Sequence, residues 1–322
     1  MPRIERLARD LILIDTEYLQ TPQAIGAYLL LGDRPALIET GPASTVETLL
    51  EGVRAAGIDP QDLQTVAVTH IHLDHAGAAG TLVRRFPHLD VYVHPIGAPH
   101  LVDSSRLLAS AARLYGDELA RLFGEVVPIP GDRVHALSDG EAVTLGSRRL
   151  VALDTPGHAR HHLAYLDEAT GDLFTGDAAG VALPGSRYVR PPTPPPQLDI
   201  PAWDGTIARL RALGPRRLLL THFGAHTWAD DLLAQLQERL HAAEALVRSA
   251  VAAGQGEDEV TERLRAMVDA GLAAVDGPHA AGQFEVIMST RQSALGLIRY
   301  VRGQRQGAGR PSGGFPSEPT AR

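Results

Sequence analysis

The stretch Thr69-His70-Ile71-His72-Leu73-Asp74-His75 decides the fold of this 322-residue chain, because it places four potential metal ligands within six residues. It directly follows an apolar run, residues 65–68, that is typical of a buried strand. If the extended backbone continues past this run, side-chain alternation directs His70, His72 and Asp74 to one side, and the next loop turns His75 toward them. A polar loop whose histidines only bond backbone groups is the alternative, but four ligand-type residues at this spacing favour a metal site. Imidazole and carboxylate ligands suit zinc first, then iron or manganese.

Composition narrows the class of protein. The net charge of −8 and a pI near 5.9 argue against a dedicated nucleic-acid surface. The absence of cysteine excludes disulfides, thiolate ligands and a cysteine nucleophile. Residues 1–10 lack the apolar segment of a signal peptide, and no apolar run is long enough to span a bilayer. We therefore expect a cytoplasmic protein that does not bind membranes.

The pattern of short elements predicts an α/β fold. Strands are expected at 11–15, 27–31, 36–39, 65–68, 91–94, 126–129, 141–145, 149–154, 161–166, 173–175 and 217–220. Helices are expected at 44–56, 76–86, 104–123 and 203–213. Ser44 and Glu47 have the spacing of a capping box for the first of these helices. Because both halves of the pattern have strands followed by helix and strand, we expect two facing sheets with helices outside.

The segment 180–201 is rich in proline and should be a stiff, irregular loop. It is either an interdomain linker or a wall of the site, and its place after a candidate ligand favours the wall. We expect Arg187, Tyr188 and Arg190, beside the prolines, to contact substrate.

The chain after residue 229 is mostly helical by its apolar spacing, with helices near 230–254, 260–268 and 283–300. We expect a catalytic domain at 1–228, a C-terminal helical extension at 229–302 and a disordered tail at 303–322. The extension is expected to form either a lid over the site or a homodimer contact.

Three more potential ligands follow predicted strands. They are His158 after Asp154-Thr155-Pro156-Gly157, Asp177 after Thr175-Gly176, and His222 after Leu218-Leu219-Leu220-Thr221. Taken singly, each has a structural explanation as a turn residue, a cap or a core histidine. Together with the stretch at 69–75, they favour a larger metal site.

These motifs, in this order, resemble the metallo-β-lactamase superfamily between about Leu11 and Gly224, in its glyoxalase II and lactonase-like branch, without matching one subfamily. The resemblance implies a four-layer αβ/βα sandwich with a two-metal site. It implies that His70, His72 and His158 hold one metal, that Asp74, His75 and His222 hold the other, and that Asp177 bridges them. Glu39 stands where the family usually has aspartate, so a contact behind the ligands is expected to be remodelled.

The resemblance implies a binuclear hydrolase in which a metal-bridging hydroxide attacks an ester, thioester or lactone carbonyl of a small-molecule substrate. Asp74 and Asp177 would be the catalytic carboxylates, with Asp74 passing the proton to the leaving group. Phosphodiester hydrolysis would use the same site. A mononuclear iron protein similar to the persulfide dioxygenases, and a metal-stabilised binding protein without turnover, remain the alternatives.

The remaining histidines carry weaker signals. His94 follows a predicted strand, His161 and His162 lie just past His158, and His226 lies close to His222. Each is a candidate to line the pocket or to orient a ligand, with a purely structural role as the alternative.

Overall fold

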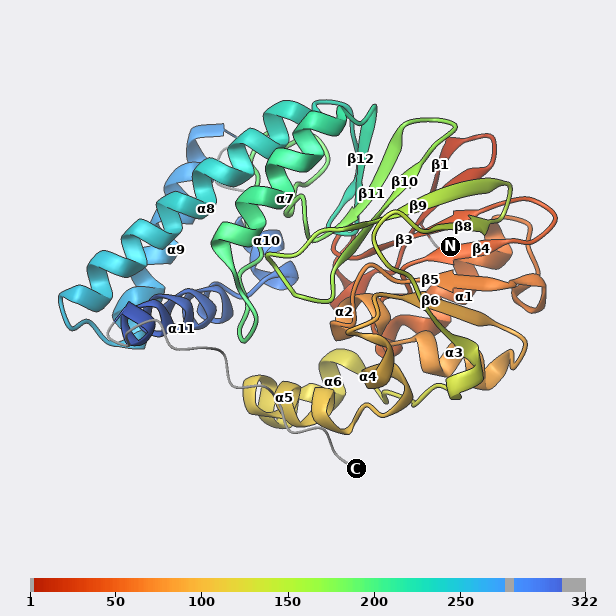
Figure 1. Ribbon diagram of the computed structural model, residues 1–322, viewed down its shortest axis with the longest axis horizontal. Helices are drawn as coiled ribbons and strands as arrows, with labels where there is room; N and C mark the ends of the chain where they lie inside the picture. Colours follow the sequence, from red (N-terminus) through yellow and green to blue (C-terminus); the bar gives the residue numbers. More distant parts are fainter. Residues whose placement is uncertain (1–2, 276–280, 309–322) are drawn as a thin grey trace.

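The computed structural model describes residues 3–275 and 281–308 and contains two β-sheets that face each other (Figure 1). The N-terminal sheet has the order β1-β2-β3-β4-β5-β6-β7. Its strands are β1 Ile4–Ala8, β2 Leu11–Asp15, β3 Gly26–Leu30, β4 Ala36–Ile38, β5 Thr65–Ala67, β6 Asp90–Val93 and β7 Val134–Ala136. Pairs from β1 to β4 are antiparallel and pairs from β4 to β7 are parallel.

The C-terminal sheet has the order β13-β12-β11-β10-β9-β8. Its strands are β8 Ala142–Leu145, β9 Arg148–Asp154, β10 Leu163–Asp167, β11 Asp172–Gly176, β12 Arg217–Leu220 and β13 Gly224–His226. Only the pair β11 and β12 is parallel among these strands.

Alternation along the strands builds three cores and hence four layers. Leu13 of β2 packs in the core between the sheets, where the rings of Tyr28 and Phe174 meet edge to face at 5.2 Å. The next residue, Ile14, faces the opposite way and packs with α1 (Val46–Ala55) and α3 (Ala79–Arg85). The outer side of the C-terminal sheet is covered by α7 (Ile200–Leu213) and α8 (Ala229–Ala252). The predicted four-layer sandwich is confirmed.

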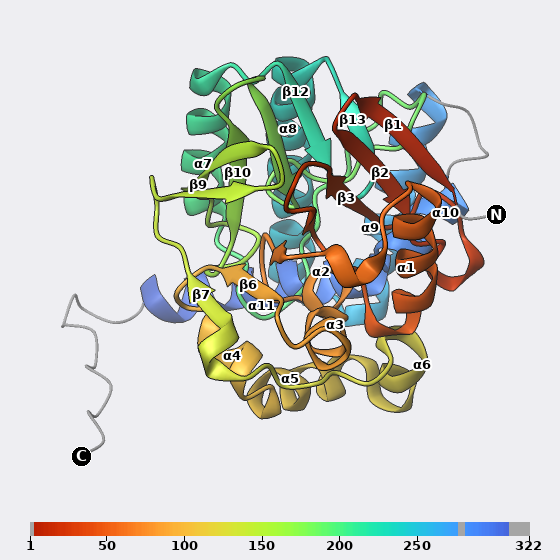
Figure 2. The ribbon, with the colours of Figure 1, turned by 90° about the vertical axis from the view of Figure 1, so that its right-hand side faces the viewer.

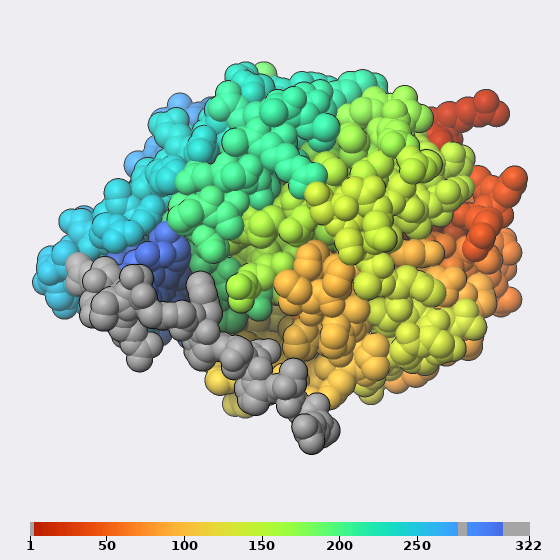
Figure 3. Space-filling model, in the orientation of Figure 1, coloured from red at the N-terminus to blue at the C-terminus, as the bar shows by residue number. Residues whose placement is uncertain are grey.

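Additional helices surround this sandwich. They are α2 Leu73–Ala76, α4 Ala98–Val102, α5 Ser105–Tyr115, α6 Leu119–Phe123, α9 Glu257–Val275, α10 Ala281–Ile287 and α11 Thr290–Ala308. Two perpendicular views place α4, α5 and α6 together at one end of the molecule (Figures 1 and 2). On the face shown in Figure 3, the second half of the sandwich, in yellow-green, separates the orange N-terminal elements from the cyan C-terminal helices.

Several predicted elements differ from the structure. Residues 126–129 form a loop, and the edge strand is β7 instead. The strand β1 was not predicted, because its charged and exposed side chains give no apolar pattern. The predicted helix 76–86 starts earlier, at α2, and is split into α2 and α3.

The predicted capping box at Ser44 and Glu47 is wrong. Helix α1 follows Thr45, whose side chain makes no cap hydrogen bond. Ser44 Oγ instead donates to Leu122 O, and Glu47 pairs with Arg85.

The C-terminal region also differs from the prediction. The predicted helix 283–300 is two helices, α10 and α11, and Thr290, which begins α11, donates from its N–H and its Oγ1 to the Glu285 carboxylate. Residues 303–308 belong to α11 rather than to a disordered tail, and 309–322 lie outside the described residues. None of the helices in the described part of the chain is both long and apolar enough to cross a membrane.

Candidate metal centre

The histidine-rich stretch enters the site through a change of local structure after β5. The strand ends at Ala67, His70 lies in the following loop, and His72 immediately precedes α2. Asp74 and His75 therefore both come from the helix, whereas the sequence pattern predicted Asp74 from continued strand alternation and His75 from a loop. The short helix achieves the same result, because it turns both side chains toward the loop histidines.

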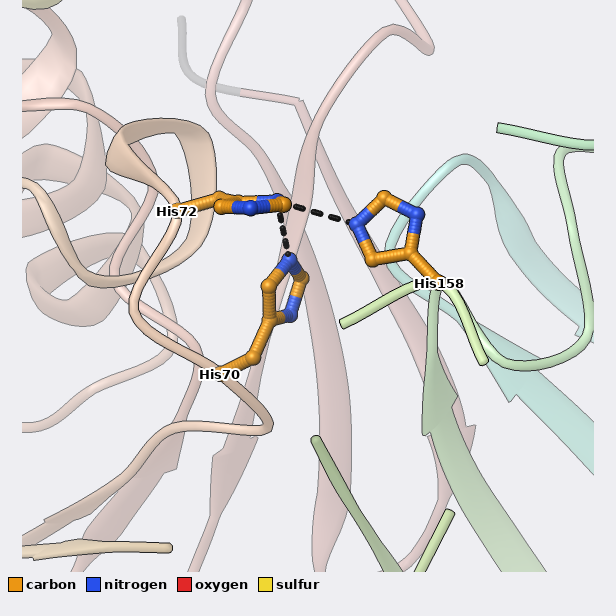
Figure 4. A group of neighbouring side chains, drawn as sticks. All are labelled: His70, His72 and His158. Carbon is orange, nitrogen blue, oxygen red and sulfur yellow. Dashed lines mark hydrogen bonds between the residues drawn. The ribbon is translucent and has the colours of Figure 1, made fainter. Parts of the chain in front are cut away.

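Three imidazoles converge at the first group of potential ligands. Nδ1 of His72 lies 2.9 Å from Nε2 of His70 and 2.9 Å from Nε2 of His158 (Figure 4). His158 comes from the loop after β9, so the group joins the two sheets. The three ligand atoms all lie within 4.8 Å of one another.

The second group lies beside the first and contains Asp74, His75 and His222. Nε2 of His222 lies 3.3 Å from Nε2 of His75 and 3.5 Å from Oδ2 of Asp74. The Asp177 carboxylate lies between the groups. Its Oδ2 is 3.3 Å from His158 Nε2, and its Oδ1 is 3.4 Å from His75 Nε2. The structure thus brings all seven predicted ligands together.

Hydrogen bonds behind the rings fix which nitrogen faces the site. Nδ1 of His158 donates to Pro192 O at 2.9 Å, and Nδ1 of His222 donates to Ala24 O at 2.8 Å. A carbonyl oxygen can only accept, so both Nδ1 atoms carry hydrogen. Nε2 is therefore the nitrogen of each ring that faces the site, and its lone pair can bind a cation when the ring is neutral.

Glu39 organises the back of the site. Its carboxylate accepts hydrogen bonds from Thr69 Oγ1 at 2.5 Å, Thr221 Oγ1 at 3.1 Å and His75 Nδ1 at 3.0 Å. Glu39 has a left-handed backbone, with φ 67°, directly after β4. The predicted contact behind the ligands is thus made by the longer glutamate side chain, which reaches three elements at once.

The pKa values of the histidines differ between the two groups, because burial decides the pKa of His72 and neighbouring charges decide that of His75. Burial, followed by the neighbouring His158 ring, lowers the pKa of His72 to about 3. Burial also lowers the pKa of His75, but the surrounding carboxylates, Asp177 first, outweigh it and hold that pKa well above its ordinary value. Burial raises the pKa of Asp177, but the three neighbouring histidine rings outweigh it and hold that pKa well below its ordinary value. The first group therefore offers neutral rings, while the second attracts positive charge.

The donor set fits divalent cations. Oδ1 of Asp177 is buried and has no hydrogen-bond partner among the described residues. Nδ1 of His75 bonds the Glu39 carboxylate, and Nδ1 of His222 donates to Ala24 O. The Nε2 atoms of the two rings face each other at 3.3 Å. Such a set of lone pairs and carboxylates is stable only with positive charge between them, and imidazole and carboxylate are ligands that zinc, iron and manganese accept.

Two of the weaker histidine candidates lie at the site. Nε2 of His162 accepts the Asp177 N–H at 3.1 Å, and its Nδ1 lies 2.7 Å from Thr155 Oγ1, so His162 positions the Asp177 backbone. His161 lines the pocket in front of the ligands, with its ring 5.5 Å from the His72 ring.

The other two weaker candidates do not line the pocket. Nδ1 of His94 accepts the Ile96 N–H, and its Nε2 lies 3.3 Å from Asp154 Oδ1. His226 donates to the backbone oxygens of Ala182 and Phe223. Both histidines support loops next to the site.

The structure does not bring Arg187, Tyr188 and Arg190 to the pocket. Arg187 stacks over Trp228, and Tyr188 is buried beneath the Arg239 guanidinium. Arg190 is buried and donates to Phe284 O and Thr290 Oγ1. These side chains turn away from the prolines to hold the C-terminal helices, which sequence proximity alone does not reveal.

Besides the ligand residues, the pocket is lined by parts of the chain that carry no motif. The proline loop forms one wall through Pro192, Pro194, Pro195 and Pro196. The other walls are formed by α5, α6 and the junction of α10 with α11; their lining residues are Arg106, Leu107, Ser110, Ala111, Leu114, Tyr115, Phe123, Ile287, Met288 and Gln292. In the sequence, the hydrophobic residues around 101–114 favour an apolar or acyl substrate, but core packing explains them equally well.

Comparisons with known proteins agree with this geometry. Residues 21–222 match the family model described as the metallo-beta-lactamase superfamily. The metallo-beta-lactamase fold-containing protein ST1585 of Sulfurisphaera tokodaii is 27% identical over 220 residues, which cover 67% of this chain and 79% of that protein. A hydroxyacylglutathione hydrolase of a Synechococcus species is 32% identical over 164 residues, or 49% of this chain and 51% of that enzyme. The chain thus spans about half the length of this relative.

Solved structures show the same fold. The metallo-beta-lactamase family protein TTHA1429 from Thermus thermophilus superposes with a TM-score of 0.70 at 22% identity. The match covers 93% of this chain and 95% of that one, so it includes the C-terminal helices.

Proposed function

Because the chain belongs to the metallo-beta-lactamase superfamily, we propose that it is a binuclear hydrolase of esters, thioesters or lactones. The family match and the hydrolase relatives confirm the broader expectation of a metal-dependent hydrolase. One observation supports two ions in particular: His70, His72 and His158 form one group of ligand atoms, and Asp74, His75 and His222 form another. A third group, made of His70, His75 and Asp177, connects them, and the Asp177 carboxylate lies close to both.

In this proposal His70, His72 and His158 hold one ion, and Asp74, His75 and His222 hold the other. Zinc suits these ligands best, with iron or manganese as alternatives. Divalent ions, when bound, lower the pKa of water to about 7 and polarise a carbonyl oxygen. The proposal needs no serine or cysteine nucleophile.

The protein residues supply orientation and proton transfer. Asp177 is buried, and His162 holds its backbone N–H, so its carboxylate is fixed between the two groups. The Asp74 side chain is 27% exposed and lines the pocket, whereas the Asp177 side chain is 5% exposed. Asp74 is therefore the carboxylate we assign to proton transfer toward the leaving group.

The pocket supports a small-molecule substrate and a role for the C-terminal helices. Ile287, Met288 and Gln292 line it, so we propose that the extension predicted at 229–302 is a wall of the site rather than only a dimer contact. Homodimer formation, a cytoplasmic location and the lack of nucleic-acid binding stay predictions.

The test begins with the metal content of protein purified without chelator. We expect close to two ions per chain and hydrolysis of at least one class among lactones, thioesters, aryl esters and phosphodiesters. His72→Ala should lose the activity and about one ion per chain. Asp74→Ala, if still folded by circular dichroism, should lose turnover, which would separate an enzyme from a binding protein.

Two results would overturn the proposal. One iron per chain, with oxygen consumption and no hydrolysis, would favour an iron-dependent redox protein on the same fold. Hydrolysis confined to phosphodiesters would move the substrate class away from carbonyl compounds.

A further inference from the structure

Arg106 is the one residue lining the pocket with a permanent positive charge in the described part of the chain. It lies in the first turn of α5, which forms one wall of the pocket. The other charged lining residues are the ligand carboxylates Asp74 and Asp177 and several histidines. The pocket therefore has a positive charge on its α5 wall, from Arg106, and negative charges at the metal centre, from Asp74 and Asp177.

The Arg106 guanidinium has no hydrogen bond or ion pair within residues 3–275 and 281–308. Arg106 acts on the Asp103 carboxylate only through its charge, and that carboxylate accepts the Ser105 N–H at 3.0 Å. That hydrogen bond is the main reason for the lowered pKa of Asp103, and the charges of Arg106 and His100 contribute less. By contrast, Arg113 on the same helix donates to Ala109 O. Arg106 thus keeps its donors for a ligand.

An apolar surface lies beside Arg106 on the same helix. Leu107, Ala111 and Leu114 are spaced by four and three residues, so they form one face of α5, and all three line the pocket. Phe123 and Met288 extend this surface toward the C-terminal helices. A substrate on this face would meet the metal centre, an apolar wall and a guanidinium.

We propose that the substrate is an acyl ester or thioester whose apolar chain lies on α5 and whose anionic group binds Arg106. This inference rests on the proposed hydrolase function and narrows its substrate class. Guanidinium forms paired, charge-assisted hydrogen bonds with carboxylate and phosphate alike. The anion has two sources: a carboxylate at the far end of the acyl chain, or a phosphate in the leaving thiol.

Two matched pairs of substrates separate these sources. The 4-nitrophenyl ester of hexanoate is compared with the 4-nitrophenyl monoester of hexanedioate, in which a carboxylate replaces the terminal methyl group. The hexanoyl thioester of coenzyme A is compared with the hexanoyl thioester of N-acetylcysteamine, which lacks the phosphates. All are assayed with the metal-loaded, full-length protein.

One of the two pairs should contain the anionic group that Arg106 binds. For the anionic substrate of that pair, we expect Arg106→Gln to lower kcat/KM about 10-fold, mainly by raising KM. For the neutral substrate of the same pair, kcat/KM should change less than about twofold, because the contact that the variant loses is the one to the anionic group. Arg113→Gln, two turns further along α5, is the matched control and should leave kcat/KM unchanged for both substrates of the pair. Arg106 is exposed, so its replacement should not impair folding.

Equal effects of Arg106→Gln on charged and neutral members of both pairs would overturn the inference. So would a wild-type protein that hydrolyses neutral members as well as charged ones. In either case the hydrolase proposal survives, because the neutral substrates are still cleaved. Failure to cleave any of the four with two ions bound would overturn the inference, and the hydrolase proposal would fall with it only if lactones were not cleaved either.

Discussion

At the scale of single residues, Glu39 links the metal centre to two strands. One of its oxygens receives three donors, from Thr69, Thr221 and His75, and the other receives the Thr69 N–H at 3.3 Å. In Glu39→Gln the amide nitrogen would replace one of these oxygens and face a donor. We expect metal affinity to fall about 10-fold or more, as for other groups that orient ligands from behind. Competition with a chromophoric chelator measures this change.

The control for Glu39 is Glu51→Gln, an exposed glutamate on α1. It should bind metal as the wild type does. Because Glu39 is buried, its variant also needs urea unfolding at saturating metal, which separates loss of affinity from loss of fold. A folded Glu39→Gln protein with unchanged affinity would show that the carboxylate does not support the site.

The ligand residues could be predicted because each is a metal-type side chain after an apolar strand, as for His222 after β12. Of the pocket walls, the proline loop was predicted, but the helical walls could not be. Arg106 and Gln292 lie on amphipathic helices far apart in sequence, and only the packing of α5 and α11 brings them to one pocket. Arg190 is the opposite case. Its position beside the prolines predicted a contact with substrate, but its side chain is buried and bonds to the C-terminal helices.

At the scale of elements, Arg190 ties the proline loop to α10 and α11. It is 3% exposed and donates to Phe284 O at 3.1 Å and to Thr290 Oγ1 at 2.8 Å. Arg190→Met removes two charged hydrogen bonds from the buried contact, and Phe284 O keeps only its bond from the Met288 N–H. We expect the free energy of unfolding to fall by about 3 kcal/mol.

Urea unfolding measures the effect, with Arg265→Met as the comparison. Arg265 lies 3.6 Å from Glu285 with a side chain 39% exposed. Its loss should cost less than about 1 kcal/mol, because exposed ion pairs contribute little. Similar costs for the two variants would mean that the buried contacts of Arg190 do not hold the helices to the loop.

At the scale of the whole molecule, the two facing sheets were predictable from the repeated order of strands and helices. The strands of the sheet interior, such as β2 and β12, have the predicted bounds because most of their residues are apolar and buried. The edges were not predictable in the same way. The strand β1 is exposed, and β7 has only three residues, so neither has the apolar run that identifies a strand in a sequence.

One charged contact joins the two sheets at these edges. Arg148 of β9 donates to both oxygens of Asp10, in the turn between β1 and β2, and to Asp167 Oδ2 at 2.6 Å. The Arg148 side chain is 5% exposed. The hydrogen bond from Arg148 is the main reason that the pKa of Asp10 falls to about 2.

Because this pKa is lower in the folded state than in the unfolded chain, Asp10 stabilises the fold above its ordinary pKa. That contribution should disappear as the pH falls from about 4 to about 2. Asp10→Asn should therefore lower the free energy of unfolding by about 1 kcal/mol near neutral pH, a modest value because Asp10 is partly exposed. The difference from wild type should close toward about pH 2, and Asp33→Asn, an exposed aspartate, should show no such trend. Metal release at low pH affects both proteins alike, so a difference that stays constant across this range would show that the Asp10–Arg148 pair does not couple the sheets.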